Sequence, residues 1–102
     1  MKNGDIAFTT EKVSNGIRLI VKGRIDSINA VELGYALGHA VREGQPNLIL
    51  NMEHVEYLCS TGIRVIIKAY KEVLDAGGKF EIENPSECVR DILEVIAWAR
   101  KG

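Results

Sequence analysis

The sequence predicts an α/β fold with a small sheet of about four strands and crossover helices, in the order ββαβαβα. Three observations indicate this order. Two short strand patterns open the chain, a wholly apolar run follows at Leu48-Ile49-Leu50, and later strand patterns alternate with apolar residues at helical spacing. The chain has 102 residues, of which 46% are hydrophobic, which is enough for one core. We therefore expect residues 1–102 to form a single domain.

The first half of the chain is expected to contain a hairpin and a helix. Residues 6–10 alternate weakly, residues 17–22 form a second strand pattern, and the turn pair Asn15-Gly16 lies between them. Asp26 or Ser27 is a suitable N-cap for the helix that follows. The apolar positions of this helix recur at helical spacing and are Ala30, Leu33, Leu37, Ala40 and Val41.

A buried strand and a second helix are expected next. The apolar run at residues 48–50 is typical of a strand covered on both faces, and residues 51–58 are predicted to form a polar loop. A helix is predicted from about Ser60 to Ala76, and Gly77-Gly78 ends it.

The chain is expected to finish with a strand and a third helix. Residues 79–83 alternate as a strand. Asn84-Pro85 predicts a cap followed by proline at the first helical position. Trp98 falls in this helix, and we expect it either to pack on the sheet or to lie at a partner surface.

Composition and charge exclude several classes of protein. The net charge is −1, and no basic block indicates binding to nucleic acid or to a lipid surface. No apolar run is long enough to span a membrane, and the first residues lack the apolar stretch of a signal peptide. We therefore expect a cytoplasmic protein in which Cys59 and Cys88 are free thiols.

The segment Cys59-Ser60-Thr61-Gly62 is the most informative stretch, because it lies between the buried strand and the second helix. A hydroxyl there stands at a helix N-terminus, where unpaired N–H groups and a partial positive charge favour a phosphate. Ser60 is therefore a helix cap, an anion contact or a phosphorylation site. A capping Ser contributes about 1 kcal/mol, and the cap and phosphorylation hypotheses are compatible.

Residue patterns for catalysis are weak. Cys59 and His54 are a conceivable nucleophile and base, but the sequence specifies no orienting group or oxyanion donor for them. Neither His39 nor His54 has a partner at metal-ligand spacing, and no glycine-rich phosphate loop is present. We therefore expect no catalytic residues, no metal site and no cofactor.

Several motifs together resemble the STAS domain, and specifically the small anti-sigma factor antagonists of bacteria. Gly23-Arg24-Ile25-Asp26 resembles the family pattern G-x-[LI]-D after the second strand. Residues 47–58 resemble its apolar strand and the segment that follows. Cys59-Ser60-Thr61-Gly62-Ile63-Arg64 resembles its signature D-S-[STA]-G-[LI], and the break at Gly77-Gly78 also fits.

The resemblance implies a phosphorylation-controlled partner switch that is not itself an enzyme. In this family the unphosphorylated antagonist binds an anti-sigma factor, which is also a serine kinase, and frees a sigma factor. Phosphorylation of the signature Ser releases the antagonist, and a PP2C-type phosphatase restores it. The resemblance implies that Ser60 is the phosphorylated residue. The partner-binding residues that it implies are Asp26, Cys59, Ser60, Thr61, Gly62 and Arg64.

Two positions depart from the family pattern. Cys59 stands where the family usually has Asp before the phosphorylated Ser, and Asn51 stands where Asp is usual. Two other functions therefore remain open at this point. One is a STAS scaffold that is never phosphorylated and serves as a subunit of a sensory or lipid-transport complex. The other is a small enzyme that uses Cys59.

Overall fold

The computed structural model describes residues 6–43 and 46–101, and for residues 95–101 the backbone alone. The order of elements is ββαβαβα, as the sequence predicts. Trp98 lies among the residues whose side chains are outside the described part of the chain. The elements are β1 (Ile6–Val13), β2 (Gly16–Ile25), α1 (Ala30–Arg42), β3 (Asn47–Leu58), α2 (Ser60–Asp75), β4 (Phe80–Glu83) and α3 (Glu87–Lys101).

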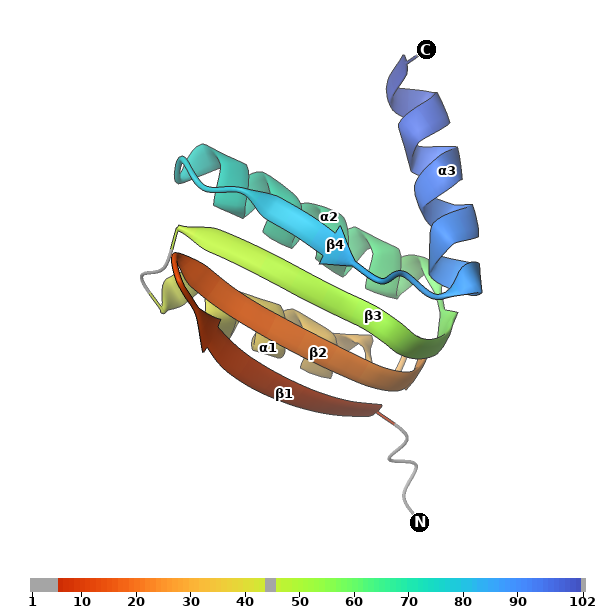
Figure 1. The fold of residues 1–102 in the computed structure, drawn as a ribbon. Coiled ribbons are helices and arrows are strands. Elements are labelled where there is room, and N and C mark those ends of the chain that lie inside the picture. The colour runs from red at the N-terminus through yellow and green to blue at the C-terminus, as the bar shows by residue number, and fades with distance from the viewer. Residues whose placement is uncertain (1–5, 44–45, 102) are drawn as a thin grey trace.

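The strands form a mixed sheet in the order β1-β2-β3-β4. β1 pairs with β2 antiparallel, whereas β2 with β3 and β3 with β4 are parallel. Both α1 and α2 lie on one face of this sheet (Figure 1). The core lies between that face and the two helices, and its most deeply buried side chains include Leu19, Val21, Leu33, Leu37, Leu50 and Met52.

The prediction that the strand at residues 48–50 is covered on both faces is wrong. Leu48 and Leu50 are buried under the helices, but Ile49 points to the opposite face and is only half-buried. No helix in the described part of the chain covers that face (Figure 1). The middle residue of this apolar run instead lies among the long polar side chains of the neighbouring strands. An apolar run therefore does not require a second layer of helices.

The predicted loop at residues 51–58 is also wrong, because β3 continues to Leu58. Two irregularities interrupt its pairing with β2, between Ile20 and Lys22 and between Gly23 and Arg24. At each of them β3 contributes an additional residue, which reverses the alternation of inward and outward side chains. The period of two that identifies a strand in a sequence is therefore lost, although the strand itself continues.

The end of α2 follows the prediction, and the start of α3 does not. Gly77 has φ +86°, its N–H donates to Leu74 O, and Gly78 N–H donates to Val73 O at 2.9 Å, so a Schellman motif ends α2. Asn84 has φ +50° and lies in a bend instead of capping a helix. α3 begins only at Glu87, because Ser86 N–H donates to Met52 O and holds the preceding residues against β3.

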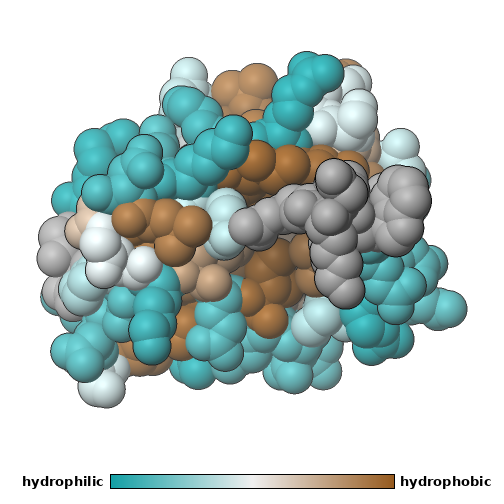
Figure 2. All heavy atoms as spheres, turned by 90° about the horizontal axis from the view of Figure 1, so that it is seen from above, coloured by the Kyte–Doolittle hydropathy of each residue, from teal (hydrophilic) through white to brown (hydrophobic). Residues whose placement is uncertain are grey.

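Apolar side chains also reach the surface on the side of the molecule where β4 and α2 lie in Figure 1. Figure 2 views the molecule from that side and shows a band of hydrophobic atoms bordered by hydrophilic ones. A small hollow there is lined by Ile63 and Ile67 from α2, Ile82 from β4 and Ile92 from α3. All four side chains are half-buried, and Ile63, Ile82 and Ile92 also pack against the main core. Ile92 therefore joins α3 to the rest of the molecule.

A polar network connects all four strands on the face without helices. The Arg18 guanidinium on β2 donates to Glu83 on β4 at 2.9 and 3.2 Å, and to Glu11 on β1 at 3.1 Å. The Asn51 amide on β3 donates to the same Glu83 carboxylate at 2.9 Å. These bonds, led by that from Arg18, hold the pKa of the Glu83 carboxyl below its ordinary value of 4.5.

We expect Glu83→Gln to lower the free energy of unfolding at neutral pH and to have progressively less effect in acid. Because the pKa of Glu83 is lowered by folding, its contribution is complete above 4.5 and is lost as the pH falls through the folded value. Denaturant titrations across this range measure the difference. Glu81→Gln is the control, since Glu81 is exposed on β4 and has no ion pair in the described part of the chain. An equal effect of Glu83→Gln at all pH values would contradict the prediction.

Candidate functional site

The parallel pairing of β2 and β3 brings the two loops of the candidate site together. Ile25 and Leu58 are paired residues at the ends of these strands. The Cys59 N–H donates to Ile25 O at 2.9 Å, so the strand pair continues up to the first residue before α2. Asp26 and Ser60 therefore leave the sheet at the same edge, and α1 and α2 both begin there (Figure 1).

Asp26 organises the loop before α1, but it is not the N-cap of that helix. The helix begins at Ala30 after Asn29, so the prediction of Asp26 or Ser27 as the cap is wrong. The Asp26 carboxylate accepts from Ile28 N–H at 2.9 Å and from Asn29 N–H at 2.8 Å. The Asn29 side chain returns a bond by accepting from Asp26 N–H at 2.9 Å and donates to Arg24 O. This reciprocal pair inserts a tight turn between the strand and the helix.

Cys59, and not Ser60, is the N-cap residue of α2. Cys59 has an extended backbone, and its sulfur accepts from Gly62 N–H at 3.4 Å. The hypothesis that Ser60 is the helix cap is therefore wrong by one residue. Thiols are weak acceptors, and Cys59 also packs half-buried against the core. The cap is consequently weaker than the one that Asp, Asn or Ser provides.

Ser60 is the first residue of α2, and its side chain is exposed. Its hydroxyl makes no hydrogen bond within the described residues. The first turn of α2 contains no acidic side chain, and Arg64 lies exposed one turn further along the same side of the helix. A phosphate at Ser60 would therefore meet the positive end of the helix and a nearby cation.

Gly62 is needed for the close approach of α2 to the sheet. It is buried, and a Cβ built there would lie 2.7 Å from Leu58 Cδ1 and 2.8 Å from Ile25 Cγ2. Both contacts are shorter than side chains normally make. Gly62 therefore seats the start of α2 against the ends of β2 and β3, while Thr61 beside it is half-buried.

The structure does not bring Cys59 and His54 together as a catalytic pair. His54 lies on β3 opposite Lys22 and is exposed, whereas Cys59 interacts with Gly62 N–H. Cys88 is free as well, and its thiol lies 3.5 Å from Val55 O. Among the described residues, no group of three or more His, Cys, Asp and Glu side chains is arranged to hold a metal ion.

Exposed apolar and aromatic side chains near this edge were missed by the sequence analysis. Ile28 is 84% exposed, Val31 54% and Tyr35 75%. Tyr57 is also exposed, and the Arg24 guanidinium lies 4.8 Å from the centre of its ring. Sequence periodicity assigns such residues to a helix or a strand, but it does not show which of them remain uncovered after folding.

The family model that describes the STAS domain matches residues 8–101. The chain belongs to the STAS domain family. Within the part of the chain that the structure describes, no helix has both the length and the apolar character needed to cross a membrane.

The individual proteins to which the chain is similar include anti-sigma factor antagonists. The chain is 27% identical over 107 aligned positions to the anti-sigma-B factor antagonist of Bacillus subtilis, covering 96% of this chain and 97% of that protein. An anti-sigma factor antagonist from Mycobacterium paratuberculosis has a crystal structure with a TM-score of 0.83 and 22% identity, covering 98% and 85% of the two chains. The phosphorylated form of the Bacillus cell fate determinant SpoIIAA gives a TM-score of 0.71 and 20% identity, covering 92% and 86%.

We expect Gly62→Ala to lower the free energy of unfolding by about 1–3 kcal/mol, because the added methyl group overpacks the contact with Ile25 and Leu58. Gly34→Ala is the matched control within a helix. A Cβ at Gly34 would meet its nearest neighbour, Val65, at an ordinary 3.5 Å. This control should gain roughly 0.5–1 kcal/mol from helix propensity. Equal stability of the two variants in urea titrations would show that the close approach at Gly62 is not needed.

We expect Cys59→Asp to raise the free energy of unfolding by about 1 kcal/mol at neutral pH. A carboxylate accepts the Gly62 N–H bond more strongly than a thiol and interacts favourably with the helix N-terminus. The gain should disappear in acid as the carboxyl group is protonated. Cys59→Ala, which removes the acceptor, serves as the comparison, and an Asp variant no more stable than the Ala variant would contradict the capping role.

Proposed function

We propose that this protein is a cytoplasmic anti-sigma factor antagonist whose binding is controlled by phosphorylation of Ser60. The observation that carries the proposal is the exposed, unbonded hydroxyl at the first residue of α2, at the position that resembles the family's signature Ser. In this proposal the partner is an anti-sigma factor with serine kinase activity, and a PP2C-type phosphatase removes the phosphate. In this proposal the protein acts through binding and not through catalysis, without direct contact with nucleic acid and without insertion into a membrane.

The proposed switch changes charge and leaves the fold unaltered. A phosphate adds about −1.5 to −2 charges at a helix end that favours negative charge, so α2 should remain intact. A partner surface that accepts a neutral helix end then faces a dianion, which imposes desolvation and repels acidic groups. The similarity of the fold to that of phosphorylated SpoIIAA supports a switch without refolding.

The proposed docking surface consists of the edge where α1 and α2 begin. Asp26, Ser60 and Arg64 are exposed there, and Cys59 and Thr61 are half-buried beside them. Gly62 belongs to this surface only indirectly, because it is buried and sets the position of the helix start. We also propose that residues 1–102 form a single STAS domain that carries this surface.

We expect the anti-sigma factor kinase to transfer one phosphate from ATP to Ser60. Intact mass before and after incubation, followed by peptide mapping, measures the modification. Ser60→Ala should abolish it, whereas Ser27→Ala should be modified like the wild type, since Ser27 is an exposed serine on the neighbouring loop. Ser60→Ala should still bind the anti-sigma factor, and Ser60→Asp should bind it at least about tenfold more weakly.

Two outcomes would redirect the proposal. If the kinase modifies another antagonist but leaves this chain unmodified, the protein is a constitutive STAS scaffold, and Cys59 in place of Asp becomes the first residue to exchange. If Ser60→Asp retains full affinity, the phosphate does not act by its charge.

A further inference from the structure

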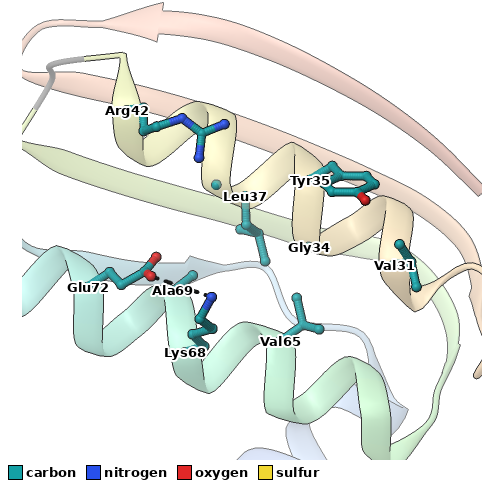
Figure 3. A pocket seen from close by; sticks show the side chains of 10 residues that line it. Val31, Gly34, Tyr35, Leu37, Arg42, Val65, Lys68, Ala69 and Glu72 are labelled. Atoms are coloured by element: carbon teal, nitrogen blue, oxygen red, sulfur yellow. Dashed lines mark ion pairs between the residues drawn. The ribbon is translucent and has the colours of Figure 1, made fainter.

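A groove runs between α1 and α2 on the surface of the molecule, and it begins beside the candidate site. Its volume is about 360 Å³. Figure 3 shows that Val31 and Tyr35 on α1 and Val65 on α2 lie toward one end of the groove, while Arg42 and Glu72 lie toward the other. The apolar end is the N-terminal end of both helices, where Ser60 also lies. Its full lining is Val31, Gly34, Tyr35, Leu37, Gly38, Arg42, Val65, Lys68, Ala69 and Glu72.

Two glycines on α1 keep the groove open. Gly34 faces Val65, and a Cβ added at Gly34 would lie 3.5 Å from the Val65 side chain. A Cβ at Gly38 would lie 3.2 Å from Arg42 Nη1, so the Arg42 guanidinium extends along the groove over a position without a side chain. The floor between the helices is formed by the small or apolar residues Leu37 and Ala69.

The apolar end of the groove is continuous with the loop that carries Asp26. Ile28 lies on that loop, and Val31 and Tyr35 follow on the outer side of α1. Each of the three side chains is more than half exposed, at 84%, 54% and 75%. Clustered exposed apolar groups of this kind mark interaction surfaces, and tyrosine is among the residues that contribute most to protein interfaces.

The other end of the groove carries an unbalanced positive charge. The Lys68 ammonium group forms an ion pair with Glu72 at 3.7 Å, so these two charges offset each other (Figure 3). Arg42 has no ion-pair partner among the described residues. The occupant that matches this surface therefore presents apolar groups at one end and a carboxylate at the other.

We propose that the groove between α1 and α2 binds an amphipathic helix of the anti-sigma factor, with apolar side chains against Val31, Tyr35 and Val65 and an acidic side chain against Arg42. This inference rests on the proposed function and extends its docking surface beyond the phosphorylated edge. The part of α1 that borders the groove, from Val31 to Arg42, is about 16 Å long at 1.5 Å per residue, which is the length of three helical turns. An apolar face in a groove between two helices is a common mode of helix recognition.

The groove and the Ser60 edge then contribute differently to binding. The groove is constant and supplies contact area, whereas the charge at Ser60 changes with phosphorylation. Variants in the groove should weaken binding whether or not Ser60 carries a phosphate, and they should leave the site of phosphorylation unchanged.

The test measures the affinity of the full chain for the anti-sigma factor by isothermal titration calorimetry. Tyr35→Ala and Arg42→Glu should each weaken binding about tenfold, and the effect of Arg42→Glu should shrink in high salt. Leu74→Ala and Lys12→Glu are the matched controls, since Leu74 is exposed elsewhere on α2 and Lys12 is exposed on β1. Circular dichroism of every variant checks that the fold is retained. Hydrogen exchange in residues 31–42 should slow in the complex.

The possible outcomes separate this inference from the proposed function. If Ser60→Asp weakens binding and both groove variants bind like the controls, the groove inference is wrong and the switch stands. If the wild type does not bind the anti-sigma factor, both are wrong. Sedimentation of the protein alone tests a second copy as the occupant. Dimers that Tyr35→Ala dissociates would overturn the inference in favour of self-association.

Discussion

The parallel pairing of β2 and β3 is the interaction on which the rest of the structure depends. It continues to the end of both strands, where the Cys59 N–H donates to Ile25 O. Because the strands are parallel, their last residues lie side by side, and each helix that follows begins at the same edge. Gly62 then allows α2 to lie directly against Ile25 and Leu58. The position of Ser60 is therefore set by backbone pairing and by one residue without a side chain.

This arrangement separates the groups that maintain the fold from the group that is free to be modified. The Asp26 carboxylate accepts hydrogen bonds from the N–H groups of Ile28 and Asn29, and the Cys59 sulfur accepts one from Gly62 N–H. The Ser60 hydroxyl makes no hydrogen bond within the described residues. A charge placed on it acts outward on a partner, because the helix end tolerates an anion and no internal contact is broken.

The two faces of the sheet have different chemistry for a related reason. The face under α1 and α2 is apolar and supplies the core. On the opposite face, the Arg18 guanidinium forms ion pairs with Glu11 and Glu83 and so connects the strands across the sheet. Its polar side chains satisfy one another without a covering layer. The exposed apolar groups Ile28, Val31 and Tyr35 instead gather on α1 and the loop before it, which places contact area near the proposed phosphorylation site.

The sequence by itself determined the order ββαβαβα, the position of α2 and its glycine stop, because apolar residues at helical spacing and a glycine with positive φ act locally. The signature around Ser60 was equally local, and it placed the hydroxyl at the start of a helix. The full length of β3 was decided by tertiary structure, since its two irregularities appear only when it pairs with β2. Likewise, Gly62 became buried and Tyr35 remained exposed because of how distant segments pack. These properties depend on contacts between elements, which no periodicity within one element records.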